Sequence, residues 1–221
     1  MADQLELGIA WAAHELRAPL IGAEAVVDRA IQVTDDHSQA QPLLRRSQRE
    51  LRRHMDLVET ILDWSTESRF MKRRPADLNR IVNEAIRMAC ADSDMDRVDF
   101  MPSGDVLVRG NRRYLVIAIA NLIRNALIYS QETTHVMVRV GRQGEFALVG
   151  VNDQGSGVPR AERESIFEPF VRGRSGLKSS RGAGLGLFIA NQVVQAHEGR
   201  IWFESGRSGT TFHIELPAIA G

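Results

Sequence analysis

The hexapeptide Asn152-Asp153-Gln154-Gly155-Ser156-Gly157 places one carboxylate beside two glycines that are spaced one residue apart. It follows the apolar run 146–151, which has the length and composition of a buried strand. The carboxylate of Asp153 could accept a hydrogen bond from an exocyclic amine such as that of adenine. Gly155 and Gly157 lack Cβ atoms, so the backbone can turn sharply and approach a planar ligand. By itself the pattern is weak and is more often an ordinary β-turn.

Two asparagines lie one helical turn apart in the otherwise apolar stretch 114–129. Asn121 and Asn125 therefore share one face of the predicted helix 111–129. Buried amides are costly unless they are satisfied, and an amide oxygen is a suitable ligand for Mg²⁺. We expect Asn125 to bind the metal ion and both asparagines to contact the phosphate groups of a ligand. The alternative is a pair of hydrogen bonds from the helix to a loop.

A glycine-rich turn opens the predicted helix 185–197 and supplies a third element. Helix N-termini direct free N–H groups and a positive dipole end toward anions. The turn contains Gly182, Gly184, Leu185 and Gly186. The segment 159–184 that precedes it is long enough for a lid, and Arg172 within it is a candidate phosphate ligand, although loop cations are also simply solvated.

A histidine near the N-terminus could receive a phosphoryl group. His14 is followed by Glu15, a carboxylate that could take a proton from the imidazole and leave its other nitrogen nucleophilic. Positions 12 and 16 belong to the apolar seam of a helix, which predicts that His14 faces water. Pro19 removes one backbone donor and should weaken the helix just beyond. Most exposed helix histidines carry no chemistry, and that reading also stands.

The elements that hold these residues fall into two groups. Apolar residues spaced three and four apart run through 5–30 and again through 44–65, with a break near 34–38. This pattern predicts a dimerisation hairpin over 1–70, which would pair with a second copy as a dimeric four-helix bundle. We expect a linker at 71–76 and an α+β sandwich over 77–221. Its predicted strands are 97–100, 106–109, 134–140, 145–152, 200–205 and 209–216, and its helices 77–90, 111–129 and 185–197.

Bulk composition excludes several classes of protein. The 28 basic and 28 acidic side chains cancel, which argues against binding nucleic acid or a membrane surface through net charge. The single cysteine, Cys90, excludes an intrachain disulfide and suits a reducing compartment. The sequence shows no signal peptide and no apolar run that could span a bilayer. We expect a cytoplasmic location, as a separate protein or as the cytosolic part of a longer sensor.

The segment His14-Glu15-Leu16-Arg17-Ala18-Pro19-Leu20 resembles the H-box of sensor histidine kinases. The later segments around Asn121–Asn125, Asp153–Gly157, Phe167–Phe170 and Gly182–Gly186 are similar to the N, G1, F and G2 boxes of their GHKL (Bergerat-type) ATP-binding domain, in the same order. The resemblance implies that His14 is phosphorylated with Glu15 as activating partner. It also implies ATP and Mg²⁺ as cofactors, with Tyr129 flanking the adenine ring.

Two positions depart from the family pattern. Ala18 stands where the family usually has Thr or Asn, a side chain implied to position water for dephosphorylating the partner. Ile128 stands where many members have a basic residue that touches phosphate. We therefore expect weak phosphatase activity and, without that contact, modest affinity for ATP.

The resulting expectation is an ATP-dependent histidine kinase that autophosphorylates His14 and passes the phosphoryl group to an aspartate of a response regulator. Two alternatives come from other classes. A GHKL-type ATPase clamp would keep the nucleotide elements but would not need His14 and Glu15. A catalytically weak dimeric signalling or binding module would fit the absence of a cation at Ile128.

Overall fold

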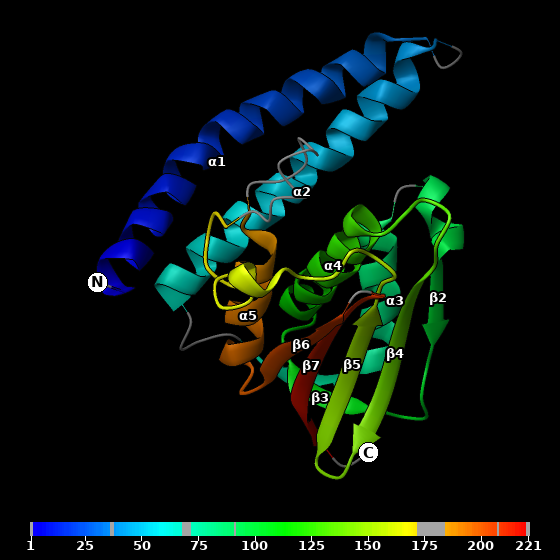
Figure 1. Ribbon diagram of the computed structural model, residues 1–221. Coiled ribbons are helices and arrows are strands. Elements are labelled where there is room, and N and C mark those ends of the chain that lie inside the picture. Colours follow the sequence, from blue (N-terminus) through cyan, green and yellow to red (C-terminus); the bar gives the residue numbers. More distant parts are fainter. Residues whose placement is uncertain are drawn as a thin grey trace. The chain divides into compact units, whose positions relative to one another are not determined.

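The computed structural model describes residues 2–35, 38–67, 72–90, 92–171, 184–206 and 208–219; within them, the side chains of 2–12, 14, 53, 57, 59–67, 92 and 93 are not described. The chain divides into two compact units, Met1–Phe70 and Met71–Gly221. Figure 1 shows the helices and strands of both. No helix among these described residues is long and apolar enough to cross a membrane.

The first unit is a hairpin of two long helices, α1 (Ala2–Val33) and α2 (Ala40–Glu67). Pro19 lies inside α1, as the sequence predicts. The inward-facing positions of α1 recur every three or four residues, which is the period of an amphipathic helix; they include 20, 23, 24, 27, 28 and 31. Leu16, expected on this seam, is 52% exposed instead. Several other apolar side chains of the hairpin are also exposed, namely Ile21, Val26, Val33 and Leu43.

Gln41 stabilises the turn between the two helices of the hairpin, a role that was not predicted from the sequence. Its side chain is buried and donates from Nε2 to the carbonyl oxygens of Ile31 and Thr34 at 3.0 and 2.8 Å. These carbonyls belong to the last turn of α1, where the helix itself supplies no partners. Gln41 therefore caps α1 from the first turn of α2 and fixes where the chain reverses.

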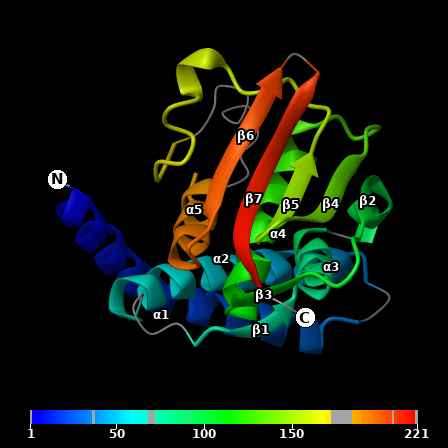
Figure 2. The same ribbon diagram turned by 90° about the horizontal axis from the view of Figure 1, so that it is seen from below.

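The second unit is a seven-stranded sheet covered on one face by helices, as Figures 1 and 2 show. The strand order is β1-β3-β7-β5-β4-β2, with β6 paired to β7. Every pairing is antiparallel except that of β2 with β4. The strands are β1 (Arg74–Asp77), β2 (Val98–Met101), β3 (Leu107–Gly110), β4 (Val136–Gln143), β5 (Phe146–Asn152), β6 (Arg200–Gly206) and β7 (Gly209–Ile219).

Three helices pack on this sheet: α3 (Leu78–Ala89), α4 (Arg112–Tyr129) and α5 (Gly186–Ala196); short 3-10 turns η1 (Asp92–Arg97) and η2 (Arg160–Glu162) lie between elements. Alternate residues of the central strands face the helices, as expected for a half-buried sheet. The buried residues of β5 and β7 include Ala147, Val149, Val151, Phe212, Ile214 and Leu216. The α+β sandwich expected from the sequence is therefore confirmed for this unit.

The predicted linker at 71–76 is wrong at its C-terminal end. Arg74–Asp77 form β1, which pairs antiparallel with β3. Pro75 cannot donate to a ladder, and proline is tolerated only in edge strands; β1 is such an edge. A four-residue strand containing proline gives no alternating pattern strong enough to read from the sequence.

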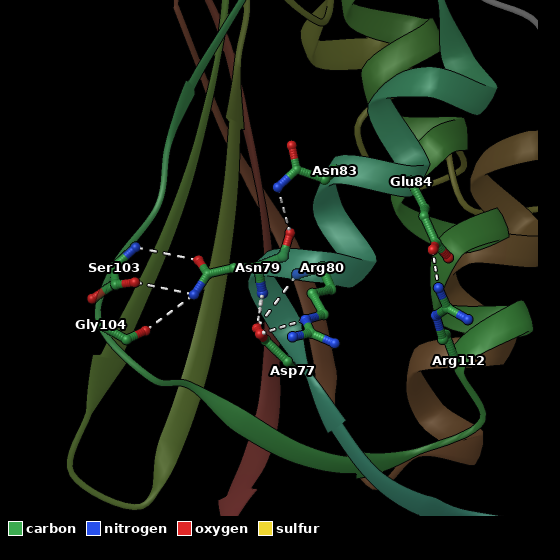
Figure 3. A network of polar contacts seen from close by, with 8 residues as sticks. All are labelled: Asp77, Asn79, Arg80, Asn83, Glu84, Ser103, Gly104 and Arg112. Atoms are coloured by element: carbon green, nitrogen blue, oxygen red, sulfur yellow. Dashed lines mark hydrogen bonds and ion pairs between the residues drawn. The ribbon is translucent and has the colours of Figure 1, made fainter.

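A polar network fixes the start of α3, as Figure 3 shows. Asp77 caps the helix by accepting from the backbone N–H groups of Asn79 and Arg80. The Asn79 amide donates to the carbonyl oxygens of Ser103 and Gly104 at 3.0 Å each and so holds the loop between β2 and β3. An ion pair between Glu84 and Arg112 joins α3 to the first residue of α4.

Candidate functional site

Asp153 lies directly after β5, which is hydrogen-bonded to β4 on one side and β7 on the other. Its side chain is 4% exposed, and Oδ1 accepts from the N–H groups of Gly155 at 2.7 Å and Thr210 at 3.2 Å. Burial raises the pKa of the Asp153 carboxyl above its ordinary value, and these two N–H groups oppose that rise. Both bonds end on Oδ1, so Oδ2 is left to accept from a ligand.

The two glycines of the loop are required by close approach of the backbone. A Cβ on Gly155 would lie 2.5 Å from the carbonyl oxygen of Tyr129. Gly157 has a φ of +74°, and a Cβ there would lie 2.1 Å from the carbonyl oxygen of Gly206. No side chain fits at either position without a shift of the backbone. The loop is thus pressed between the end of α4 and the end of β6.

The asparagines of α4 share a face, as the spacing predicts. Asn121 is 3% exposed, while Asn125 is half-buried one turn later. The side chain of Asn121 lies against the first residue of α5, because a Cβ added to Gly186 would be 3.3 Å from Asn121 Oδ1. Tyr129 ends α4 and is 39% exposed, so its ring can contact a ligand.

The described part of the glycine-rich turn is Gly184, Leu185 and Gly186, which lead into α5. Gly184 has a φ of +74°, and a Cβ there would lie 2.8 Å from the carbonyl oxygen of Val171. Phe170 donates from its N–H to the Gly184 carbonyl at 3.0 Å. Phe170 and Val171, within the segment 159–184 that was expected to be a lid, therefore lie against its last residue, Gly184. Arg172 and Gly182 lie outside the described residues.

Phe167 anchors the near end of that segment. Its ring centroid lies 6.2 Å from that of Phe203 and 6.5 Å from that of Phe212, on the last two strands. Such aromatic contacts stabilise beyond their buried area. The expected packing of Phe167 is confirmed, whereas Phe170 is 56% exposed with a φ of +64° and does not pack there.

Gly209 and Thr210 lie against Asp153 and complete the site, although neither was predicted from the sequence to be a site residue. Asp153 donates from its N–H to the Thr210 carbonyl at 2.8 Å, and a Cβ on Gly209 would lie 1.9 Å from the Asp153 carbonyl oxygen. Thr210 is 4% exposed and shares a hydrogen bond of 3.1 Å with the hydroxyl of Ser205. The available signal was the Gly-Thr pair that opens the last apolar strand.

The phosphoacceptor candidates lie on the other unit. His14 is within α1, but its side chain, and hence its predicted exposure, lies outside the described residues. Glu15 follows it and is exposed, as are the residues up to Pro19. The structure thus gathers in one unit the described residues that were expected to bind nucleotide, and it does not relate them to His14; they are Asn121, Asn125, Tyr129, Asp153, Gly155, Gly157, Gly184, Leu185 and Gly186.

Comparison with known proteins agrees with this arrangement. Residues 110–220 match the family described as histidine kinase-, DNA gyrase B-, and HSP90-like ATPase. The sensor-like histidine kinase SenX3 of Mycobacterium tuberculosis is 32% identical, over 96% of this chain and 53% of SenX3. The sensor histidine kinase RppB of Synechocystis is also 32% identical, over 95% of this chain and 48% of its own length. The chain spans about half the length of these relatives.

Solved structures show the same fold. The mycobacterial sensor histidine kinase MprB superposes with a TM-score of 0.57 at 28% identity, covering 67% of this chain and 99% of MprB. Full-length ShkA, solved with AMPPNP, gives 0.69 at 21% identity, covering 97% of this chain and 46% of ShkA, and at that identity it supports the fold alone. The resemblance to the sensor histidine kinase catalytic core is confirmed, and the chain belongs to the histidine kinase-, DNA gyrase B- and HSP90-like ATPase family.

Proposed function

We propose that this chain is an ATP-dependent protein-histidine kinase that autophosphorylates His14 and passes the phosphoryl group to an aspartate of a response regulator. The observation that carries this proposal is the cradle formed by Asp153, Gly155 and Gly157 beside the face of α4 that bears Asn121 and Asn125. The similarity to sensor histidine kinases over nearly the whole chain extends the proposal to the hairpin.

The adenine end of the site is built for a flat amine-bearing ring. Oδ2 of Asp153 accepts from the exocyclic amine, while Oδ1 is held by two backbone N–H groups. Gly155 and Gly157 let the loop pack against the carbonyl oxygens of Tyr129 and Gly206, which holds Asp153 in place. Tyr129 presents its partly exposed ring at the end of α4 and flanks the base.

The phosphate end of the site lies where α5 begins. The backbone N–H groups of its first turn, preceded by Gly184, bind phosphate oxygens at the positive end of the helix dipole. The half-buried amide of Asn125 fits one position of a magnesium ion that keeps several waters. When bound, magnesium would neutralise part of the negative charge that spreads over the transferred phosphoryl group. Arg172 adds a cation from the lid segment.

The transfer itself uses His14 and Glu15. A ring nitrogen of His14 forms a bond to the γ-phosphorus while the bond from that phosphorus to the bridging oxygen breaks and ADP leaves. Glu15, which is exposed beside it, takes the proton from the other ring nitrogen. The reaction requires the nucleotide unit and the hairpin to approach each other. Transfer of the phosphoryl group to an aspartate of the response regulator regenerates the free imidazole of His14.

The hairpin supports a homodimer arranged as a four-helix bundle. One copy leaves Leu16, Ile21 and Val26 at 52%, 48% and 69% exposure on α1. A second hairpin is the simplest partner that covers apolar side chains left exposed on a long helix. We further propose that a receiver domain is its other partner, that this segment contacts neither nucleic acid nor membrane, and that it works in the cytoplasm, as a separate protein or as the cytosolic part of a longer sensor.

Incubation with γ-labelled ATP and Mg²⁺ tests this function against its alternatives. The proposal predicts label on the protein that is stable in base, labile in acid and absent from His14→Ala. Free labelled phosphate without labelled protein would indicate an ATPase clamp instead. Bound nucleotide with neither product would indicate a binding module. Glu15→Gln should retain nucleotide binding and lose most of the labelling rate.

A further inference from the structure

A buried cation lies beside the nucleotide site on α4. Arg124 is only 8% exposed, and its Nη1 donates to Oδ1 of Asn121 at 3.0 Å. Arginine is rarely buried unless its donors are satisfied. Neither the spacing of the asparagines nor the composition of α4 requires a cation at this place. The hydrogen bond therefore indicates that Arg124 has a function that involves the side chain of Asn121.

The chemistry of the pair fixes the orientation of the Asn121 amide. A guanidinium group has only donors, so it can engage the carbonyl oxygen of an amide but not its nitrogen. The Arg124 contact consequently fixes which amide atom is the acceptor Oδ1 and which is the donor Nδ2. That Nδ2 is buried and has no hydrogen-bond partner within the part of the chain that the structure describes. A buried donor without an acceptor is unfavourable until a ligand supplies one.

The surroundings of Asn121 indicate which ligand that is. The amide packs against Gly186 at the start of α5, with Oδ1 and Cγ at 3.3 and 3.5 Å from the position of an added Cβ. Free N–H groups of the helix N-terminus also collect at this point. A donor amide, a helix N-terminus and a guanidinium group together favour an anion. Phosphate oxygens of a nucleotide are the acceptors of this class.

We propose that Arg124 is a positioning residue of the nucleotide site, which holds Oδ1 of Asn121 so that Nδ2 donates to a phosphate oxygen of ATP. The inference rests on the proposed binding of ATP and refines it. It assigns different roles to the two asparagines, because the positive charge of Arg124 beside Oδ1 of Asn121 disfavours a metal ion at that oxygen. Asn121 then binds phosphate, and the metal falls to Asn125.

The same arrangement addresses the missing cation at Ile128. Positions 124 and 128 are four residues apart on α4 and therefore share a face of the helix. Arg124 places a positive charge one turn earlier than the family's basic residue, and close to the asparagine that binds phosphate. Through Asn121, Arg124 therefore contributes to phosphate binding from the helix face on which Ile128 carries no charge.

Arg124 also lies near the end of α3, where its charge, together with that of Arg97, opposes the rise that burial and Asp94 give to the pKa of the Cys90 thiol. A purely structural role between α3 and α4 must therefore be distinguished from positioning. Two substitutions serve this purpose. Arg124→Leu removes both the donors and the charge, whereas Arg124→Gln removes the charge and shortens the side chain but keeps an amide donor.

The experiment measures dissociation constants of ATP, ADP and adenosine for the full chain by isothermal titration calorimetry. We expect Arg124→Leu to weaken ATP and ADP by roughly tenfold or more, the effect of one charge-assisted hydrogen bond. Adenosine, which lacks phosphates, should change by less than about twofold, within the error expected for independent sites. Arg124→Gln should fall between Arg124→Leu and the parent for ATP.

A double-mutant cycle with Asn121→Ala tests whether Arg124 acts through Asn121. The double variant should bind ATP within about twofold of Asn121→Ala alone, because the positioned amide is already gone. The dependence of ATP affinity on Mg²⁺ should survive in Arg124→Leu and be lost in Asn125→Ala, which a structural role would not produce.

Three results would overturn the inference: unchanged ATP affinity in Arg124→Leu, equal losses for ATP and adenosine, or additive effects in the cycle. A parent chain that binds no ATP would instead overturn the proposed function. If Arg124→Leu does not fold, Arg124→Gln and its own cycle with Asn121→Ala provide the same comparison.

Discussion

Replacing Gly157 by alanine should separate the steric demand of the nucleotide loop from the general cost of a left-handed backbone. Gly157 has a φ of +74°, and an added Cβ would lie 2.1 Å from the Gly206 carbonyl oxygen and 3.0 Å from the Ser205 hydroxyl. The chain offers a matched control in Gly144, in the turn between β4 and β5. Its φ is +60°, and a Cβ there meets nothing within 4 Å.

The two substitutions share one cost and differ in another. A left-handed alanine costs about 1–2 kcal/mol at either position. The contact with the Gly206 backbone can be relieved only by moving one of the two loops, and overpacking of this kind costs about 1–3 kcal/mol. Gly144→Ala should therefore lower the free energy of unfolding by about 1–2 kcal/mol, and Gly157→Ala by about 2–5 kcal/mol.

Urea unfolding followed by tryptophan fluorescence measures this difference. The chain has three tryptophans, and only Trp202 belongs to the second unit. A background with Trp11→Phe and Trp64→Phe makes the signal specific for that unit. Equal losses of stability in Gly157→Ala and Gly144→Ala would refute the steric argument. The same is true if Gly157→Ala binds ATP as tightly as the parent, since its loop would then not have moved.

Asp153→Asn should weaken ATP binding at least tenfold in calorimetry, as expected when one charge-assisted acceptor is lost. It should also raise the urea midpoint at pH 7, because the pKa of Asp153 is raised above 3.8 by burial and the ionised group therefore opposes folding at any pH above its folded pKa. Burial lowers the pKa of His197 below 6.5, and its neutral Nε2 accepts from the N–H of Asn111 at 2.9 Å. Protonation therefore favours the unfolded state, and urea midpoints should fall as the pH drops below about 6.5. The fall should be smaller in His197→Gln. Ile128→Lys should tighten ATP binding about ten- to hundredfold, measured in the same titration. Ala18→Thr should increase the rate at which a phosphorylated receiver partner is dephosphorylated, and a rate equal to the parent's would contradict the role given to that position.

Local pattern was sufficient wherever neighbours in sequence decide the structure. The period of two in β4 and β5 and the period near four in the hairpin follow from which side chains must be buried, so those elements lie where they were expected. The same holds for Asn121 and Asn125, which share a face because four residues make one helical turn. Pro19 within α1 was likewise readable from the sequence.

Features that depend on distant pairing could not be read in this way. Thr210 reaches Asp153 because β7 pairs with β5 in one register, with Asn152 opposite Thr211, and a separation of 57 residues hides this. β1 exists because β3 offers an edge to Arg74–Asp77, which carry no strand pattern of their own. Arg124 was visible as the one cation in the apolar run 114–129, but its bond to Asn121 depends on its rotamer.

The central claim is that a nitrogen of His14 takes the terminal phosphoryl group of ATP bound beside Asp153. Mapping the phosphorylated peptide by mass spectrometry at neutral to alkaline pH, after incubation with ATP and Mg²⁺, tests this directly. The account predicts one phosphoryl group on the His14 imidazole, absent when Asp153 is replaced by asparagine at low ATP. Phosphate on a serine, threonine or aspartate, or an unmodified His14 in a chain that binds ATP, would contradict it.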